Sequence, residues 1–402
     1  MKIKLLRLSN SLDPNATFKK EDDQFIEDLN NELFEDDIEL VETSSPDASM
    51  ILIETGGSEQ HFVKVEKDLP RPIILLSTCK NNSLPACLEI KTYLRNEHSE
   101  DAILLLGKEK EIAGAIKDIS KILSARDFVE GSNLGVIGTP SDWLIASKVN
   151  YEDVKKKYDI NLIDIPSSEL KEEINKGIID NIPRLENVKK LGKDNEYLQG
   201  ALEIYSGIKR IVEKYNLKGF TIRCFDLIEE YKNTACLALA MLNDEGIIGT
   251  CEGDIPSMLT MFFVKAVSGQ PSFQANPSKI DLETRNVLFA HCTIPMTMVS
   301  DVTYMTHFES GLGIGIRGKL DQRDISILKL EPKLEHSLFL EGKIVSNPAL
   351  DNYCRTQIEV KFDDEDGLFA LLREDFGNHV IIAYGNIIPE YVNLLHFYNQ
   401  KK

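Results

Sequence analysis

The chain has 402 residues, 42% of them hydrophobic, and its 65 acidic against 46 basic side chains give a net charge of −19 at pH 7. This length exceeds the size at which a single core stops growing, so we expect two or three domains. The negative charge excludes nucleic acid and anionic membranes as general partners, because both repel a negatively charged surface.

Neither a membrane segment nor a disulfide framework is expected. The sequence has no uninterrupted apolar run of about 18 residues, the length that a membrane-spanning helix requires. Its basic and apolar first residues are interrupted by Arg7 and end at Asn10, which predicts a first strand and not a signal peptide. Seven scattered cysteines are typical of a reducing compartment. We therefore expect a cytoplasmic protein.

The first 130 residues alternate short apolar runs with amphipathic segments, as in a parallel sheet with helical crossovers. Strands are predicted at residues 3–8, 49–53, 73–77 and 102–106, and helices at residues 24–33, 84–95 and 110–123. Polar loops at 54–58 and 77–83 each follow a strand, where open α/β sheets place ligand contacts. Alternatively, both loops are turns that their glycine and asparagine residues permit.

A second unit is predicted from residue 131. Strands are expected at 134–137 and 161–165, and long solvated helices between 167 and 215. The loop at 138–144 carries the only tryptophan, Trp143. Glycines 135 and 138 lack the spacing of a dinucleotide-binding fingerprint, so nucleotide binding is not favoured.

The texture changes from residue 220 onward. Buried helices are expected at 235–242 and 259–267, a closing helix at 390–398, and strands at 271–275, 287–290, 326–330, 343–345, 357–362 and 380–384. The predicted fold class is therefore α/β, with two Rossmann-like parallel-sheet domains followed by a β-rich mixed C-terminal domain. We place the domains at 1–130, at 131–219 with helices shared from 220–268, and at 220–402.

Three polar clusters interrupt the apolar sequence of this last domain: Cys-Glu-Gly-Asp-Ile-Pro at 251–256, Ala-His-Cys-Thr-Ile-Pro at 290–295 and Gly-Asn-His at 377–379. Carboxylate and imidazole groups bind divalent metals and move protons near neutral pH. Asp254 also suits the N-cap of the helix that Pro256 opens, whereas Glu252 has no such local task. Each histidine at a strand end could instead be structural, but together the three clusters predict a shared site.

These clusters, with Ser-Phe-Gln-Ala-Asn at 272–276, resemble in order and spacing the metal-site segments of the L-fucose and L-arabinose isomerases. The loops at 55–57 and 140–144 extend the resemblance, so the chain looks like a short member of that superfamily. The resemblance implies two α/β domains before a β-rich domain. It also implies a sugar substrate and a homo-oligomer, a tetramer or hexamer, with active sites between protomers.

Carried over by position, the resemblance implies that Glu252, His291 and His379 are metal ligands and that Glu252 is catalytic. The second metal-binding and catalytic carboxylate of the family falls at Asn276. An amide can ligate a metal through its oxygen but cannot accept a proton. If the family's enediol chemistry operates, Asp281, Asp226 or Glu309 must supply the second acid/base group. Manganese is the expected ion, and the nitrogen-rich ligand set also suits cobalt, zinc, nickel or iron.

Other polar residues are candidates for substrate binding. Arg223 can clamp an anionic group together with Asp226, or the two form a structural ion pair. The glycine-rich stretch at 306–315 presents His307 and Glu309, or is an ordinary hairpin. Trp143 is a further candidate for substrate binding, because it lies in the 140–144 loop that extends the resemblance.

Two cysteines adjoin proposed ligands. Cys251 and Cys292 either favour thiophilic metals or are small buried apolar residues.

Three functions compete. The first is a metal-dependent aldose–ketose isomerase acting on a sugar or sugar derivative through an enediol. The second, motivated by Asn276, is a sugar-binding or regulatory protein that kept the scaffold without catalysis. The third is an epimerase or lyase that uses the same chemistry on a modified pentose.

Overall fold

The computed structural model describes residues 1–10, 17–34, 36–41, 46–98, 100–183 and 185–400. Contacts divide the chain into two units, Met1–Ser124 with Asn393–Lys402, and Ala125–Val392. Among the described helices, none is both long and apolar enough to cross a membrane.

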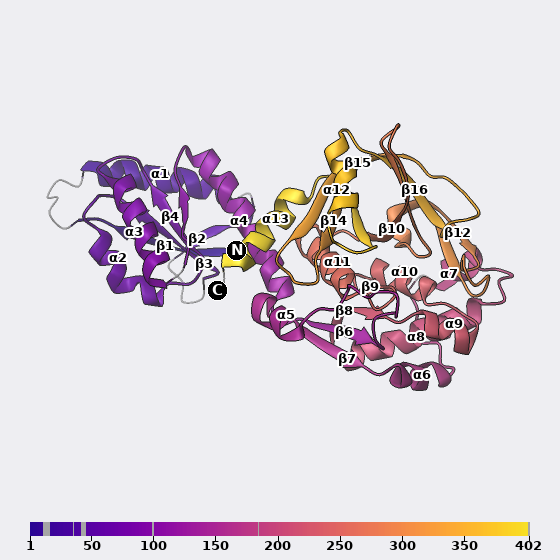
Figure 1. Cartoon of the computed structure of the whole chain (residues 1–402). Helices are drawn as coiled ribbons and strands as arrows, with labels where there is room; N and C mark the ends of the chain where they lie inside the picture. The colour runs from indigo at the N-terminus through magenta and orange to yellow at the C-terminus, as the bar shows by residue number, and fades with distance from the viewer. Residues whose placement is uncertain (11–16, 35, 42–45, 99, 184, 401–402) are drawn as a thin grey trace. The chain divides into compact units, whose positions relative to one another are not determined.

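The first unit is a doubly covered parallel sheet with strand order β2-β1-β3-β4-β5 (Figure 1). Its strands are β1 (Lys2–Leu8), β2 (Glu39–Val41), β3 (Ala48–Ile53), β4 (Ile73–Ser77) and β5 (Ile103–Leu105). Its helices are α1 (Thr17–Phe34), α2 (Glu59–Val65), α3 (Ser83–His98) and most of α4 (Glu109–Val129), with a 3-10 turn at Glu66–Asp68. The central strand β3 is buried along its whole length, and successive residues feed two separate apolar cores. Because side chains alternate across a strand, continuous apolar sequence here means helices on both faces.

The second unit begins with a four-stranded parallel sheet of order β7-β6-β8-β9. Its strands are β6 (Asn133–Ile137), β7 (Asn161–Ile165), β8 (Leu217–Ile222) and β9 (Ile248–Thr250). The accompanying helices are α5 (Tyr151–Tyr158), α6 (Ser167–Asn175), α7 (Leu185–Leu191), α8 (Leu198–Lys214), α9 (Phe225–Tyr231), α10 (Cys236–Asp244) and α11 (Ile255–Ser268). Helices α10 and α11 are buried over most of their length, as their predominantly apolar sequences predict.

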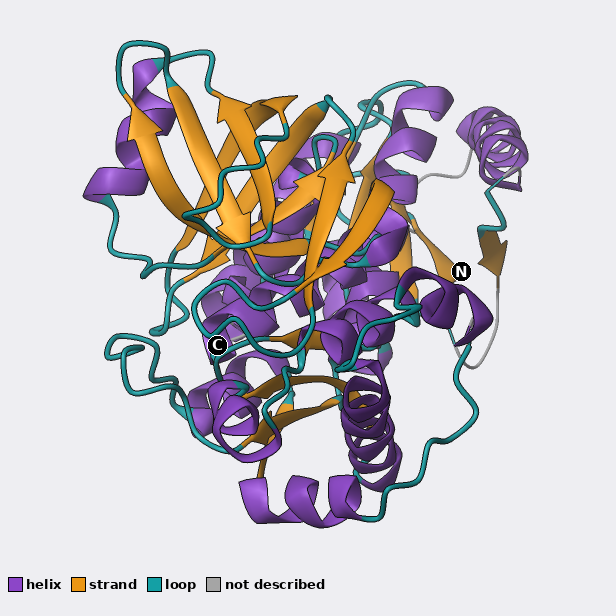
Figure 2. Cartoon of the chain, turned by 90° about the vertical axis from the view of Figure 1, so that its right-hand side faces the viewer, coloured by secondary structure: helices purple, strands orange, loops and turns teal. Residues whose placement is uncertain are grey.

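A closed antiparallel barrel follows in the same unit, with strand order β10-β11-β16-β15-β14-β17 (Figure 2). Its strands are β10 (Phe273–Asp281), β11 (Asn286–His291), β14 (Asp324–Leu330), β15 (Ser337–Ser346), β16 (Thr356–Lys361) and β17 (Val380–Tyr384). Strand β10 closes the barrel by pairing with both β11 and β17, the register being Asn276 with Ala290 and Ala275 with Val380. Closure thus places the ends of β11 and β17 on either side of β10.

The predicted fold class is confirmed, since two parallel-sheet α/β units precede a β-rich part that contains a barrel. Several elements were not predicted: β2, α2, α5, β8, α9 and β9 in the parallel-sheet parts, and β12 (Val299–Met305), β13 (Gly315–Leu320) and α12 (Glu365–Arg373) in the β-rich part. Strands β12 and β13 form a two-stranded ribbon, and polar or half-buried residues make up β12, which hides its period. The glycine-rich stretch at 306–315 joins them, so its interpretation as a hairpin is confirmed. The last helix, α13 (Ile388–Gln400), closes the chain as expected.

Candidate active site

Glu252 occupies a strained turn just after β9. Its φ of +67° lies in the left-handed region, and Gly253 follows with a φ of +72°. Backbone bonds hold this turn, because Gly253 N donates to Ile222 O at 2.9 Å and Ser141 N donates to Glu252 O at 2.9 Å. A Cβ on Gly253 would lie 2.7 Å from the Thr139 carbonyl oxygen, so only glycine fits. A non-glycine residue in this conformation costs of order 1–3 kcal/mol, and such residues cluster at functional sites.

The turn projects the Glu252 carboxylate between two histidines. His291 ends β11 and His379 directly precedes β17, so barrel closure places the two histidines at the ends of the two strands that flank β10. Glu252 Oε1 lies 3.5 Å from His379 Nε2 and 3.8 Å from His291 Nε2, and the two rings are 5.5 Å apart. All three side chains are buried, and one ligand atom from each lies within 4.8 Å of the others.

This group of Glu252, His291 and His379 has the properties of a metal site. Among the buried side-chain atoms of the described residues, His291 Nδ1 and His379 Nε2 have no hydrogen-bond partner. Leaving a buried polar atom unpaired costs about 1–3 kcal/mol, which a bound ion would recover. One carboxylate with two imidazoles is a donor set for divalent transition metals. The residues therefore fit a metal ion, and they do not define which one.

The pKa shifts of two members of the group, Glu252 and His291, favour ligation near neutral pH. Although burial favours the neutral acid, the 3.5 Å contact with His379 and the positive charge of that ring, with smaller contributions from His291 and Trp143, lower the pKa of Glu252 to about 2. Burial, together with the charge of His379, lowers the pKa of His291 to about 4. Glu252 is therefore an anion and His291 a neutral imidazole at pH 7, as metal ligands must be.

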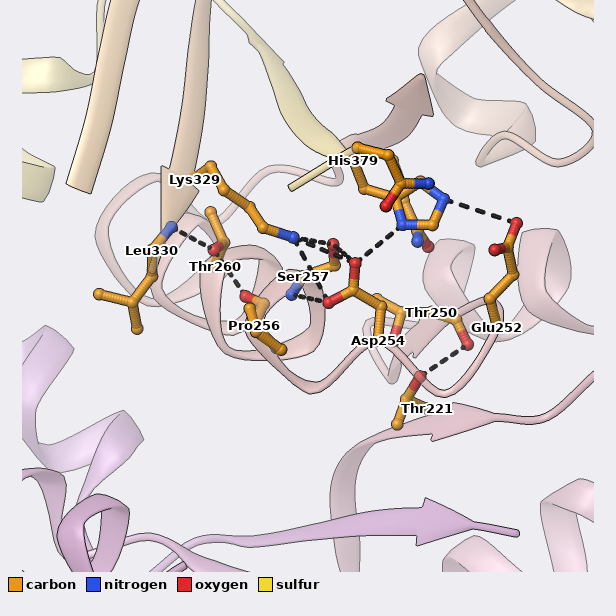
Figure 3. Close-up of polar contacts among 12 residues, drawn as sticks. Thr221, Thr250, Glu252, Asp254, Pro256, Ser257, Thr260, Lys329, Leu330 and His379 are labelled. Atoms are coloured by element: carbon orange, nitrogen blue, oxygen red, sulfur yellow. Dashed lines mark hydrogen bonds and ion pairs between the residues drawn. The ribbon is translucent and has the colours of Figure 1, made fainter. Parts of the chain in front are cut away.

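A network of buried hydrogen bonds orients the His379 ring through its other nitrogen, Nδ1 (Figure 3). Asp254 Oδ2 lies 2.8 Å from His379 Nδ1 and 3.1 Å from Lys329 Nζ, which also donates to Ser257 Oγ at 2.7 Å. Against the opposing effect of burial, Lys329 and His379 hold the pKa of Asp254 far below its usual range. The ionised Asp254 accepts a hydrogen bond from the N–H at Nδ1 of His379, so the other ring nitrogen, Nε2, faces Glu252.

Asp254 has a second role that the sequence did predict. Its side chain accepts a hydrogen bond from Ser257 N at 2.9 Å, so it is the N-cap of α11. Lys329 was missed by sequence reasoning. The available signal was a single lysine inside the apolar strand β14, at a position that is 2% exposed.

Trp143 lies beside the carboxylate of Glu252. The indole Nε1 donates to Glu252 Oε2 at 2.6 Å, and the ring packs edge-on against Phe225. Trp143 therefore contacts the proposed ligand directly, although half of its surface is exposed.

A small pocket, with a cavity volume of about 60 Å³, opens beside this group. Of the residues predicted for the site, Glu252, Asn276, His291, His307 and Glu309 line it. Asn276 Oδ1 accepts a hydrogen bond from Asn378 Nδ2 at 3.0 Å, so the two side chains form an amide pair.

Arg223, Asp226 and Asp281 are absent from the lining of this pocket as far as the chain is described. Arg223 donates to Asp226 at 3.0 Å and pairs with Asp142 at 2.8 Å, the structural ion pair that was the alternative. Asp281 Oδ1 accepts from the backbone of Glu283 in a turn at the far end of β10.

Thiols form a large part of the remaining lining, which was not predicted. Five of the seven cysteines line the pocket, namely Cys224, Cys236, Cys251, Cys292 and Cys354. The expectation that Cys251 and Cys292 are buried is confirmed, at 4% and 2% exposure. No local signal could reveal the convergence, because the five are spread over 131 residues of sequence, from 224 to 354.

Fold and site together define an α/β protein in which a Glu–His–His group lies where a parallel sheet meets one end of a β-barrel. Curated relatives point the same way. Sulfoquinovose isomerases of Priestia aryabhattai and Priestia megaterium are each 20% identical over 363 residues, covering 85% of this chain and 81% of the relative. That of Alkalicoccus urumqiensis is 22% identical over 221 residues, covering 52% of this chain and 50% of the relative. No family model matches. The chain is therefore similar, over most of its length, to sugar isomerases.

Proposed function

We propose that this protein is a metal-dependent aldose–ketose isomerase that acts on a sugar or sugar derivative through an enediol. The observation that carries the proposal is the buried group of Glu252, His291 and His379 beside a pocket, in a chain similar over 85% of its length to sulfoquinovose isomerases. We also propose a homo-oligomer, a tetramer or hexamer, which light scattering would test.

In this proposal Glu252, His291 and His379 hold the ion, with the amide oxygen of Asn276 as a further donor. Manganese is our first expectation, and cobalt, zinc, nickel and iron are the alternatives. When bound, such an ion would polarise the oxygens on the two reacting sugar carbons, C1 and C2, and so make the hydrogen on the carbon that is deprotonated more acidic. Trp143 holds one oxygen of Glu252 through its indole N–H, which orients the carboxylate toward the histidines.

Proton transfer between the two sugar carbons requires two groups that accept or donate protons. Glu252 is one, and it is ionised at neutral pH. Of the three candidates for the second group, Glu309 lines the pocket, whereas Asp226 is paired with Arg223 and Asp281 is held in a turn. We therefore assign Glu309 the second acid/base role, and His307 beside it the binding of a sugar hydroxyl.

The test is turnover. The purified chain, loaded with manganese, cobalt or zinc, is incubated with sulfoquinovose and with a panel of neutral and phosphorylated aldoses, and ketose formation is followed by NMR. We expect one sugar to be converted, and Glu309→Gln to lower kcat at least tenfold with a smaller effect on metal affinity. Absence of conversion with every sugar and ion contradicts the proposal.

A second candidate is a sugar-binding protein without catalysis. It is favoured by Asn276, which lines the pocket, because the resemblance to the L-fucose and L-arabinose isomerases implies a carboxylate at this position. It predicts that a sugar raises the thermal unfolding temperature of the metal-loaded chain without being converted.

A further inference from the structure

The thiol side of the pocket has no task in the proposed isomerisation. Cys224 and Cys251 are the closest pair there, with their Sγ atoms 2.8 Å apart. Both line the pocket and are 6% and 4% exposed. A disulfide requires about 2.05 Å between the sulfurs, so these two atoms need to move less than about 1 Å to form one.

The fold holds this pair together. Strands β8 and β9 are parallel neighbours with Thr221 opposite Thr250, and the two cysteines follow within three residues of these positions. The backbone bond from Gly253 N to Ile222 O, at 2.9 Å, fastens the two strand exits to each other. Approach of the two sulfurs is thus built into the edge of the sheet and does not depend on a mobile loop.

We propose that Cys224 and Cys251 are an oxidation site that forms a reversible disulfide with a peroxide entering through the pocket. One sulfur attacks the peroxide and the O–O bond breaks, so that a sulfenic acid forms on that cysteine while the thiol proton leaves with the other oxygen as water or an alcohol. The second sulfur then attacks the sulfenic sulfur, the S–S bond forms, and water leaves. Two electrons pass from the thiols to the peroxide, and a dithiol reverses the reaction.

Formation of this disulfide has a consequence that rests on the proposed function. Cys251 is bonded to Glu252, whose left-handed turn is held in place by backbone bonds on both sides. Cys251 N is itself fixed by Gln274 Oε1 at 2.9 Å. Drawing the Cys251 sulfur toward Cys224 therefore displaces the Glu252 carboxylate, and we expect metal affinity to fall at least tenfold in the oxidised protein.

The test uses the full metal-free chain treated with one equivalent of hydrogen peroxide. Intact mass should fall by about 2 Da, peptide mapping after thiol blocking should link Cys224 to Cys251, and dithiothreitol should reverse both changes. Cys224→Ser and Cys251→Ser should each prevent the link. Because two variants are tested, the result can still be read if one of them does not fold. Cys236→Ala, in the same pocket, should leave it intact.

Three outcomes overturn the oxidation site: no loss of mass, stable oxygen adducts only, or a link that maps to Cys292 and Cys354. Calorimetry with Mn²⁺ on reduced and oxidised chain tests the consequence separately. Equal affinities would overturn the displacement of Glu252. A reduced chain that binds Mn²⁺ but converts no sugar would contradict the proposed isomerase and leave the disulfide standing.

Discussion

Each of the two parallel sheets of this chain has a buried glutamate just after one of its strands, but the two glutamates have different partners. After β3, Glu54 is buried and receives the guanidinium of Arg7 at 2.7 Å, while Arg7 also contacts Asp23. After β9, Glu252 faces two imidazoles at 3.5 and 3.8 Å that retain unpaired nitrogen atoms. Both positions are the carboxyl edge of an open sheet, where ligands usually bind. The comparison teaches that position in the fold is not sufficient, because a site also needs polar atoms that the protein itself leaves unsatisfied.

The largest effect is expected from the buried cation behind the second edge. Lys329→Met leaves Asp254 without its positive partner in a fully buried environment, which should lower the free energy of unfolding by about 3–5 kcal/mol. The matched change Arg7→Met at the first edge should cost about 1–2 kcal/mol, because Arg7 is partly solvated. Urea denaturation measures both. Equal losses would show that the two edges are energetically alike.

Acid should destabilise the second edge in the metal-free protein. A histidine in the unfolded chain binds a proton below pH 6.5, whereas folded His291 does so only near its pKa of about 4. Between these values the unfolded state holds more protons, so stability should fall by about 3 kcal/mol as the pH drops from 6.5 to 4.

His379 acts in the opposite sense. Against the effect of burial, Asp254 and Glu252 raise its pKa, so its contribution is present at low pH and fades as the pH rises through the raised pKa. Unfolding of the wild type and of His291→Gln at several pH values separates the two. The His291→Gln chain should lose the acid-dependent decline, and an unchanged slope would contradict the assignment.

Metal binding should distinguish the two glutamates. Glu252→Gln removes the anionic donor of the Glu–His–His group, and we expect affinity for Mn²⁺ to fall at least about 100-fold, or about 2.7 kcal/mol. Glu54→Gln should leave metal binding unchanged, since its carboxylate is already paired with Arg7. Isothermal titration of the two variants measures this. Metal binding that survives Glu252→Gln would remove this residue from the site.

The smallest effect is expected at Asn276. Asn276→Asp places a second anion in the pocket and should tighten Mn²⁺ binding about tenfold and raise isomerase turnover. If the natural reaction uses the amide, turnover should instead fall while the metal preference shifts toward harder ions. Asn82→Asp, in the turn between β4 and α3 of the first unit, is the control. Identical affinity, preference and activity in Asn276→Asp and wild type would place Asn276 outside the site.

Local pattern was enough for much of this molecule. Continuous apolar runs predicted most of the parallel strands, though not β2, β8 or β9, because both faces of these sheets are covered by helices. The N-cap of α11 was predictable because Asp254 and its partner Ser257 are three residues apart. Glu252, His291 and His379 were selected as polar residues at the ends of buried elements, and the structure brings all three together. Strand β12 was not predicted, because its residues are half-buried or exposed and do not alternate between apolar and polar as a half-buried strand does.

By itself the sequence determined the fold class, the acidic surface and the residue types that can bind a metal. Only the tertiary structure decided that Asp254 also holds His379, 125 residues away, and that Lys329 supports both. It likewise decided that five cysteines meet in one pocket and that Arg223 is occupied by neighbouring carboxylates. The physical reason is the separation along the sequence over which each interaction acts. Propensities and caps act between residues a few positions apart, whereas the closure of the barrel through β10 and β17 brings together side chains that no local interaction connects.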